Sequence, residues 1–250
     1  MNELYYSMIF KRKSFHVFPN LYHLCPSELK EIKSFFQTIE PLCKDIRTEL
    51  RILPCEQTTC KRGEFCILIY SEKKEHYLQN VGYLGEQLDL WLVSKNIGVC
   101  WYGVGKTNET KYNGLDFVIM LAIQKVEPTH FRKDYTKAKR KSLGEIWQGN
   151  QLLSVASAAR YAPSACNTQP WLIRCGTSGL SLYQVFGKRG IMPANKVAYY
   201  NQIDLGIFML ILELCLEHEG IPFHHQLFSP TFTPAKEMLT AKYLLLKNEQ

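Results

Sequence analysis

Two long apolar segments constrain the fold of this chain more than any other feature. The first, HYLQNVGYLGEQLDLWLVSKN, covers residues 76–96 and is followed by Gly98, and the second, IDLGIFMLILELCLEHEG, ends in Gly220. A glycine that follows the last apolar residue of a periodic run is typical of a helix end. Both helices are apolar on most faces, so we expect them to be buried between two halves of one compact unit.

The two helices match at a single offset. Gly98 and Gly220 are 122 residues apart, and the same shift places Leu88 on Leu210. It also carries a helix-like segment near residues 28–39 onto another near 150–161. Agreement of both helices at one offset favours an internal duplication.

The duplication predicts an α+β fold made of two related α/β halves, residues 1–148 and 149–250, packed as an intramolecular pseudo-dimer. Apolar strand-like runs occur in both halves, at 65–70, 117–123, 171–175, 180–186 and 241–247.

Composition sets the broad class of the protein. The chain has 250 residues, of which 46% are hydrophobic and 21% charged, as expected of a globular protein rather than a disordered one. Its N-terminus lacks a signal segment, and Glu213, Glu217 and Glu219 interrupt the most apolar helix, which argues against a membrane span. We therefore expect a soluble, cytoplasmic protein with no membrane partner.

The net charge of +7 is concentrated in KRK at 11–13 and FRKDYTKAKRK at 131–141. Such an excess of positive charge is typical of proteins that bind nucleic acid. No nucleic-acid-binding module is present, however, so no nucleic-acid partner is predicted. Two short basic clusters could instead converge on a single phosphate group.

The nine cysteines do not indicate a disulfide framework, because the chain is neither small nor exported. Cys55, Cys60 and Cys66 lie close in sequence but lack the two-residue gap usual in zinc and iron–sulfur sites. Their spacing predicts reduced thiols and no metal site. No triad, Walker or metalloprotease motif occurs either, so we expect no catalytic side chain.

Four segments carry polar groups that make chemical sense together. KRKSFHVF at 11–18 sets two cations beside a hydroxyl and an imidazole, and KAKRKSLGEIW at 137–147 adds Arg140 before a helix start. RYAPSACNTQPW at 160–171 is rich in spare hydrogen-bonding groups, and GVCWYG at 98–103 places aromatics between glycines. Each alone has an ordinary structural explanation, as a basic terminus, a turn or a buried strand.

In chain order, RKSFHVF, KRKSLGEIW and APSACNTQPW resemble signatures of the FMN-dependent nitroreductase family. The long helix continuing into NIGVCWYG is similar to the central helix of that family. The loop APSACNTQPW arrives only after the repeat has begun, whereas the basic N-terminal motif lies in the first half. This order resembles the single-chain, pseudo-dimeric subgroup, which implies one complete FMN site per chain.

The resemblance also implies roles for individual residues. The phosphate and ribityl end of FMN would be held by Arg12, Lys13, Ser14 and Arg140. His16 would lie near the N1–O2 edge of the flavin ring. Backbone N–H groups of Tyr102 and Gly103 would face its N5 region. The ring would be edged by Pro163, Ser164, Ala165 and Asn167. Gln169, Pro170 and Trp171 would fix the loop.

The implied activity is electron transfer from NAD(P)H through FMN to an electron-poor small molecule such as a nitroaromatic or a quinone. The flavin would carry the chemistry, so no protein nucleophile is required. A flavin-binding or sensing protein without physiological turnover is the alternative. Both a monomer and a homodimer are compatible with the sequence.

Overall fold

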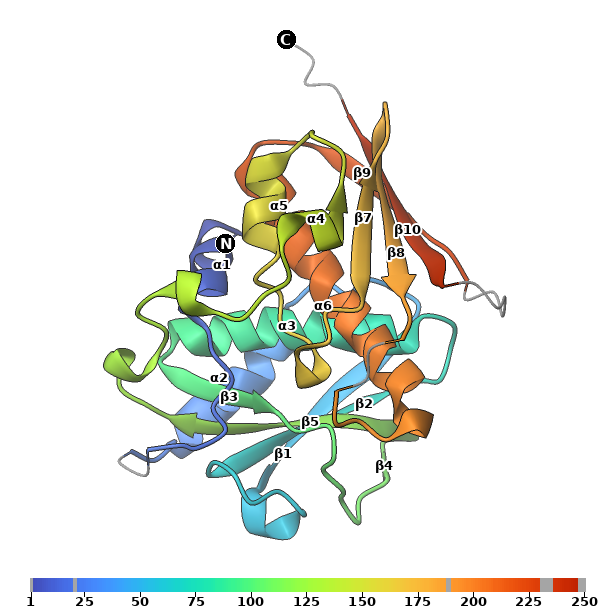
Figure 1. The fold of residues 1–250 in the computed structure, drawn as a ribbon. Helices are drawn as coiled ribbons and strands as arrows, with labels where there is room; N and C mark the ends of the chain where they lie inside the picture. Colours follow the sequence, from blue (N-terminus) through green and yellow to red (C-terminus); the bar gives the residue numbers. More distant parts are fainter. Residues whose placement is uncertain (1, 20–21, 188–189, 230–235, 247–250) are drawn as a thin grey trace.

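The computed structural model describes residues 2–19, 22–187, 190–229 and 236–246 and has an α+β fold (Figure 1). Two five-stranded sheets lie on either side of two long helices, α3 (Tyr77–Ser94) and α6 (Val197–His218), which pack extensively against each other. The predicted fold class is confirmed.

The first half contains one sheet and three helices. Its strands follow the order β1-β2-β5-β3, all antiparallel, and the short β4 extends β5 as a hairpin. The elements are α1 (Asn2–Lys11), α2 (Pro26–Phe36), β1 (Thr48–Pro54), β2 (Phe65–Ser71), α3, β3 (Ile97–Trp101), β4 (Lys111–Tyr112) and β5 (Leu115–Lys125), with the 3₁₀ turn η1 (Cys55–Gln57) after β1.

The second sheet has the order β6-β7-β8-β10-β9, and its pairs are antiparallel except for β6–β7. The elements of this region begin before the predicted boundary at residue 148, with α4 (Leu143–Ile146) and β6 (Trp147–Gln148). The second half then provides α5 (Leu153–Ala159), β7 (Trp171–Cys175), β8 (Gly179–Val185), α6, β9 (Phe223–Leu227) and β10 (Glu237–Leu245). Short 3₁₀ turns are η2 (Pro128–His130), η3 (Tyr135–Lys137), η4 (Ala165–Asn167) and η5 (Ala194–Lys196). The strands expected from the sequence are present, although Lys247 of the last one lies outside the described residues.

The main elements of the two halves follow one topology. Each half runs helix, strand, strand, long helix, strand, strand, and in each sheet the four main strands are ordered first, second, fourth, third. This common order supports the duplication proposed from the sequence. Common descent of the halves stays a prediction.

The crossing of α3 and α6 is reciprocal. A Cβ atom on Gly82 would overlap the carbonyl oxygen of Ile203, and one on Gly206 would overlap the carbonyl oxygen of Gln79. Each glycine therefore meets the residue three positions before the other, which is the contact pattern of a two-fold interface. The two backbones approach this closely only because neither position carries a side chain.

The predicted helix stop at Gly98 is wrong. Helix α3 ends at Ser94, and the left-handed residue beyond it is Asn96, with φ of 59°. Gly98 lies inside β3, where a side chain would collide with the ring of Phe15. Gly220, with φ of +67°, does end α6. The matching helix ends are thus Asn96 and Gly220, 124 residues apart, so the offset of 122 is two residues short here.

The segment Ala194–His218 is long and apolar enough to cross a membrane, so its glutamates alone do not exclude a span. In the structure 83% of its most apolar window is buried, which is the environment of the core helix of a soluble protein. Glu213 is accommodated there because it accepts hydrogen bonds from the hydroxyls of Tyr83 and Tyr243.

Candidate functional site

A cavity of about 320 Å³ is enclosed by residues from both halves. Its size is at the lower end of the range usual for small-molecule sites. The first half contributes Arg12, Ser14, His16, Trp101, Gly103 and Ile119, and the chain connecting the sheets contributes Arg132 and Arg140. The second half contributes Pro163, Ser164, Ala165, Cys166 and Asn167 from one loop and Tyr200, Ile203, Asp204 and Ile207 from α6.

Most residues singled out in the sequence line this cavity, but Lys13 and Tyr102 do not. The ammonium of Lys13 lies 4.7 Å from the centre of the Phe15 ring, on the other side of the N-terminal segment. The backbone N–H of Tyr102 donates to the carbonyl of Met120 at 2.9 Å, so the expectation that it faces a ligand is wrong. Tyr102 directly follows the cavity-lining Trp101, which is the last residue of β3.

The N-terminal segment reaches the cavity by pairing with the free edge of β3. Ser14 forms a parallel bridge with Val99, and the N–H of Phe15 donates to the Val99 carbonyl at 3.0 Å. Phe15 is buried beneath the segment, so Ser14 and His16, which alternate with it, are exposed on the opposite side. The alternation does not continue to Val17, which is 85% exposed.

Arg12 is only 2% exposed and its charge is balanced inside the protein. Its guanidinium donates to Asp89 through Nη2 at 2.7 Å and Nε at 3.2 Å, and Nε lies 3.6 Å from Glu86. Trp101 donates to the same Asp89 oxygen at 3.0 Å. Burial raises the pKa of Glu86 well above its ordinary value. Arg12 is therefore part of a buried ionic network that fixes one wall of the cavity.

Arg132 and Arg140 are less completely paired. Nη1 of Arg132 and Nε of Arg140 are buried and have no hydrogen-bond partner among the residues that the structure describes. Burial, followed by the nearby charges of Arg12 and Arg132, lowers the pKa of Arg140 to about 10. Burial and Arg12 likewise lower the pKa of Arg132. Buried cationic donors without partners are costly, so this wall is suited to an anion.

The loop that follows α5 is held in an unusual conformation. Cys166, Asn167 and Gln169 all have positive φ, between 49° and 54°, although none is glycine. Gln169 fixes the loop, because its N–H donates to Ser164 Oγ and its side-chain oxygen accepts from the N–H of Lys141, both at 2.9 Å. Backbone strain of this kind concentrates at functional sites.

The side chain of Asn167 lines the cavity but is already engaged. Its Oδ1 accepts from Nη1 of Arg140 at 3.1 Å, and its Nδ2 donates to the carbonyl of Lys139 at 2.9 Å. Arg140 also donates through Nη2 to the carbonyl of Tyr161 at 3.1 Å. The asparagine thus orients the guanidinium of Arg140 toward the cavity wall.

Asp204 is a buried acid on the α6 side of the cavity. Its Oδ1 accepts from the N–H of Ala165 at 2.8 Å, whereas its Oδ2 is buried without a partner. Burial raises its pKa to about 8, against an ordinary value of 3.8. The group is therefore mostly protonated at neutral pH, and Oδ2 then carries a proton that it can donate to a bound molecule.

Sequence reasoning missed Arg132, Asp204 and the apolar wall. Arg132 lies in the basic stretch at 131–141, but no helix or motif distinguishes it from the neighbouring cations. Asp204 is the one charged residue in the apolar run IDLGIFML at 203–210, a signal that could have been used. Ile119, Ile203 and Ile207 had no such signal, because apolar residues in a strand or helix usually belong to a core.

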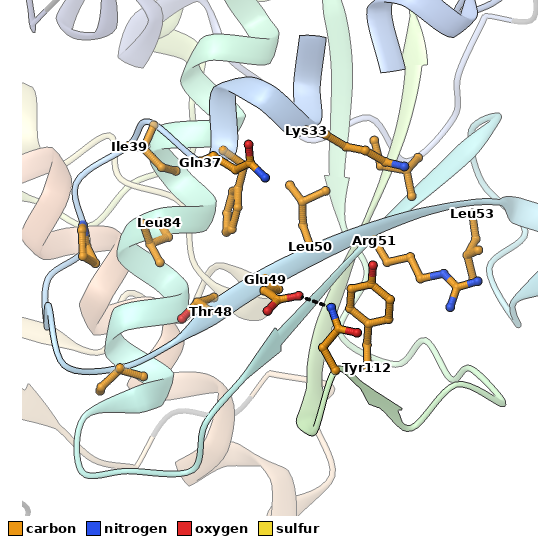
Figure 2. A pocket seen from close by; sticks show the side chains of 15 residues that line it. Lys33, Gln37, Ile39, Thr48, Glu49, Leu50, Arg51, Leu53, Leu84 and Tyr112 are labelled. Carbon is orange, nitrogen blue, oxygen red and sulfur yellow. Dashed lines mark hydrogen bonds between the residues drawn. The ribbon is translucent and has the colours of Figure 1, made fainter. Parts of the chain in front are cut away.

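A larger groove of about 950 Å³ lies between α2 and β1 and is a weaker candidate (Figure 2). Two of its charged groups are paired, since Arg51 contacts Glu109 at 2.6 Å and Glu49 accepts from Asn113 at 2.7 Å. Among the described residues, the buried polar atoms without partners include three that line the smaller cavity and none that lines this groove.

Comparisons with known proteins agree with the fold. A family model described as "Putative TM nitroreductase" matches residues 5–215. A solved structure titled as a putative nitroreductase from Thermotoga maritima is similar, with a TM-score of 0.64 and 17% sequence identity over 97% of this chain and 93% of that chain. No curated protein matches the sequence. Nitroreductases are oxidoreductases that typically bind flavin. Because the family model covers most of the chain, this protein belongs to that nitroreductase family.

Proposed function

We propose that the cavity binds FMN and that the protein is an FMN-dependent NAD(P)H oxidoreductase. The observation that carries this proposal is the pair of buried guanidinium nitrogens, on Arg132 and Arg140, which have no protein partner and border a cavity with an apolar wall. A phosphate at one end and a planar ring at the other satisfy both features at once.

The phosphate is assigned to Arg132 and Arg140 rather than to Arg12. The charge of Arg12 is already compensated by Asp89, whereas the other two cations lack a carboxylate partner within hydrogen-bonding distance among the described residues. Ser14, exposed beside them, has a hydroxyl suited to the ribityl chain. Lys13 contributes to the site only through long-range charge.

The ring is assigned to the space between Ile119 and the α6 residues Ile203 and Ile207. Pro163, Ser164 and the loop around them would border its polar edge.

His16 would lie at the same end of the ring. Its Nδ1 lies 2.9 Å from Nη1 of Arg62, and because a guanidinium can only donate, Nδ1 accepts this hydrogen bond. Gly103 completes this end of the cavity, and its carbonyl accepts from the hydroxyl of Tyr200.

When bound, FMN supplies hydride acceptance from NAD(P)H and electron delivery to an acceptor such as a nitroaromatic or a quinone. The protein positions these molecules and excludes water through its apolar wall. Asp204 holds a proton on Oδ2 in the cavity, where it can serve as a hydrogen-bond donor or as a proton source.

Purified protein tests the proposal directly. We expect a yellow protein whose released flavin is FMN, with its absorbance bleached anaerobically by NADH or NADPH and restored by a quinone. Bound FMN that NAD(P)H does not bleach would favour the flavin-binding alternative. Protein that binds neither added FMN nor added FAD would contradict the assignment of the cavity.

A further inference from the structure

The outer face of the first sheet carries a separate sulfur-rich cluster. Alternate residues of β2 point to opposite faces: Ile67 and Ile69 join the main core beside α3, whereas Cys66 and Leu68 join a second core on the other face. This second core also contains Cys55, Cys60, Cys100 and Met120. The loop that includes η1 covers it on the side of the sheet away from α3 (Figure 1).

Three of these thiols meet at one point. The Sγ atoms of Cys55, Cys60 and Cys66 lie within 4.8 Å of one another, and those of Cys55 and Cys66 are 3.4 Å apart. Their residues are 7%, 2% and 0% exposed. Sulfurs bound 2.3 Å from a tetrahedral zinc ion are about 3.8 Å apart, so the observed separation fits ligands of one ion.

The backbone holds the three thiols together. The N–H of Cys55 donates to the Glu64 carbonyl at 3.0 Å, which closes the loop between β1 and β2. Gly63, with φ of +69°, lets the loop pass close to the Ile123 carbonyl, 2.7 Å from where a Cβ atom would stand. The sequence spacing did not suggest a site, because it is this loop closure that brings the cysteines together.

A fourth donor atom faces the thiols. Both Cys55 Sγ and Cys60 Sγ point to the carbonyl oxygen of Arg62, at 2.9 and 3.5 Å. The hydroxyl of Thr58 lies 3.5 Å from Cys66 Sγ. Three sulfurs with a nearby oxygen form a soft donor set, and soft thiolate ligands select thiophilic ions such as Zn²⁺ and Cu⁺.

We propose that Cys55, Cys60 and Cys66 form a binding site for one thiophilic d¹⁰ metal ion, Zn²⁺ or Cu⁺, with the Arg62 carbonyl as an adjacent oxygen donor. The thiols lose their protons to solvent when the ion binds. Zn²⁺ would use the oxygen or a water as fourth ligand, whereas Cu⁺ would be satisfied by the three sulfurs. The site is separate from the flavin cavity and does not depend on the proposed function.

Arg62 connects this cluster to the cavity. While its carbonyl faces Cys55 and Cys60, its guanidinium donates to His16 at 2.9 Å and lies 3.4 Å from Cys100 Sγ. An ion held by the thiols would therefore also fix the backbone of a residue that orients a cavity-lining histidine.

Metal titration of the full chain tests the proposal. Protein reduced and freed of metal would be titrated with Zn²⁺ against the indicator 4-(2-pyridylazo)resorcinol and, in a separate arm, with Cu⁺ against bicinchoninate. We expect one equivalent of at least one ion per chain, and the arm in which it binds identifies the ion. X-ray absorption of the wild-type complex should show three sulfur ligands. Stoichiometric binding of neither ion would overturn the proposal.

Matched variants locate the bound ion. Cys60→Ser and Cys66→Ser should each weaken binding by roughly 100-fold. Cys175→Ser, a half-buried thiol on β7 outside the cluster, should bind like the wild type. Undiminished binding by both cluster variants would place the ion elsewhere and overturn the assignment. The sulfur count from X-ray absorption uses unmodified protein, so it decides the question even if a variant does not fold.

Discussion

Each half of the protein buries a polar side chain of its long helix against the loop that precedes the first main strand of its sheet. In the first half Asn80 accepts from the N–H of Cys43 at 3.0 Å, and in the second half Asp204 accepts from the N–H of Ala165 at 2.8 Å. Asn80 and Asp204 are 124 residues apart, the same separation as the helix ends. The two hydrogen bonds therefore occupy matching places in the two halves.

The surroundings of these two side chains differ. Nδ2 of Asn80 donates to the Thr48 hydroxyl at 3.2 Å, so both polar atoms of this side chain have partners inside the protein. Oδ2 of Asp204 borders the cavity and has no hydrogen-bond partner among the described residues. The cavity also has Arg132 and Arg140, which come from the chain that connects the two sheets. Within the part of the chain that the structure describes, one half thus keeps an unsatisfied polar atom at a position where both polar atoms of the matching side chain in the other half have partners.

The largest effect is expected at Arg12, which belongs to an N-terminal segment that the second half does not have. Arg12→Ala would leave Asp89 and Glu86 buried without their cation, and we expect the free energy of unfolding to fall by about 3–5 kcal/mol. Urea unfolding measures this, with Lys13→Ala as the control because Lys13 lies outside the network. A loss below about 1 kcal/mol would show that the network does not brace the cavity wall.

The next effect concerns the helix crossing, where the halves are most alike. Gly206→Ala and Gly82→Ala each place a methyl group against a backbone carbonyl, so each should lower the free energy of unfolding by about 3 kcal/mol. Gly144→Ala is the control, because a Cβ there meets no atom within 4 Å. If only one of the two substitutions lowered the free energy of unfolding, the claim of a reciprocal crossing would be contradicted.

A smaller effect is expected when either cation of the cavity wall is removed. Arg132→Ala and Arg140→Ala should each weaken FMN binding by about 1.5–3 kcal/mol, the contribution of a charged hydrogen bond, without a matching loss of stability. Fluorescence titration of flavin-free protein gives the affinity. Arg174→Ala on β7, whose guanidinium pairs with Glu237 at 2.5 Å on the surface, should bind FMN normally. Unchanged affinity in both cavity variants would remove the phosphate assignment.

The last effect varies with pH and comes from giving the second half the side-chain amide that Asn80 provides in the first. Because the pKa of Asp204 is raised by folding, its contribution to stability is full below about pH 4 and is lost as the pH rises to about 8. Asp204→Asn does not titrate, so its stability relative to the wild type should increase by about 1.4 kcal/mol per pH unit within this window. Unfolding measured at pH 5, 6 and 7 checks the slope. Parallel stability curves would mean that Asp204 is ionised in the folded protein.

The sequence predicted regular elements better than it predicted their ends. The strand WLIRC at 171–175 and the helix start after Arg140, which Ser142 and Glu145 cap, were predicted because local residue types decide them. Gly98 was misread as a helix stop because a glycine that ends a helix and one that admits the ring of Phe15 look the same in sequence.

The candidate site was predictable only where motifs marked it. Basic and loop motifs located Ser14, His16, Arg140 and the residues from Pro163 to Asn167, all of which line the cavity. The sequence did not reveal that Asp89 neutralises Arg12, because these residues come together only when α1 packs against α3. The thiol cluster was missed for the same reason, since loop closure rather than spacing unites it.

The number of FMN molecules bound per chain tests most directly the claim that two similar halves make one site. Protein saturated with FMN would be freed of excess ligand and denatured, and the absorbance of the released flavin would be compared with the protein concentration. One FMN per chain is the predicted result, because the cavity of Arg132, Arg140 and Asp204 combines buried cationic nitrogens and an acid oxygen that have no hydrogen-bond partner among the described residues. Two per chain would contradict the account, since each half would then hold its own site, and no bound flavin would contradict the assignment of the cavity itself.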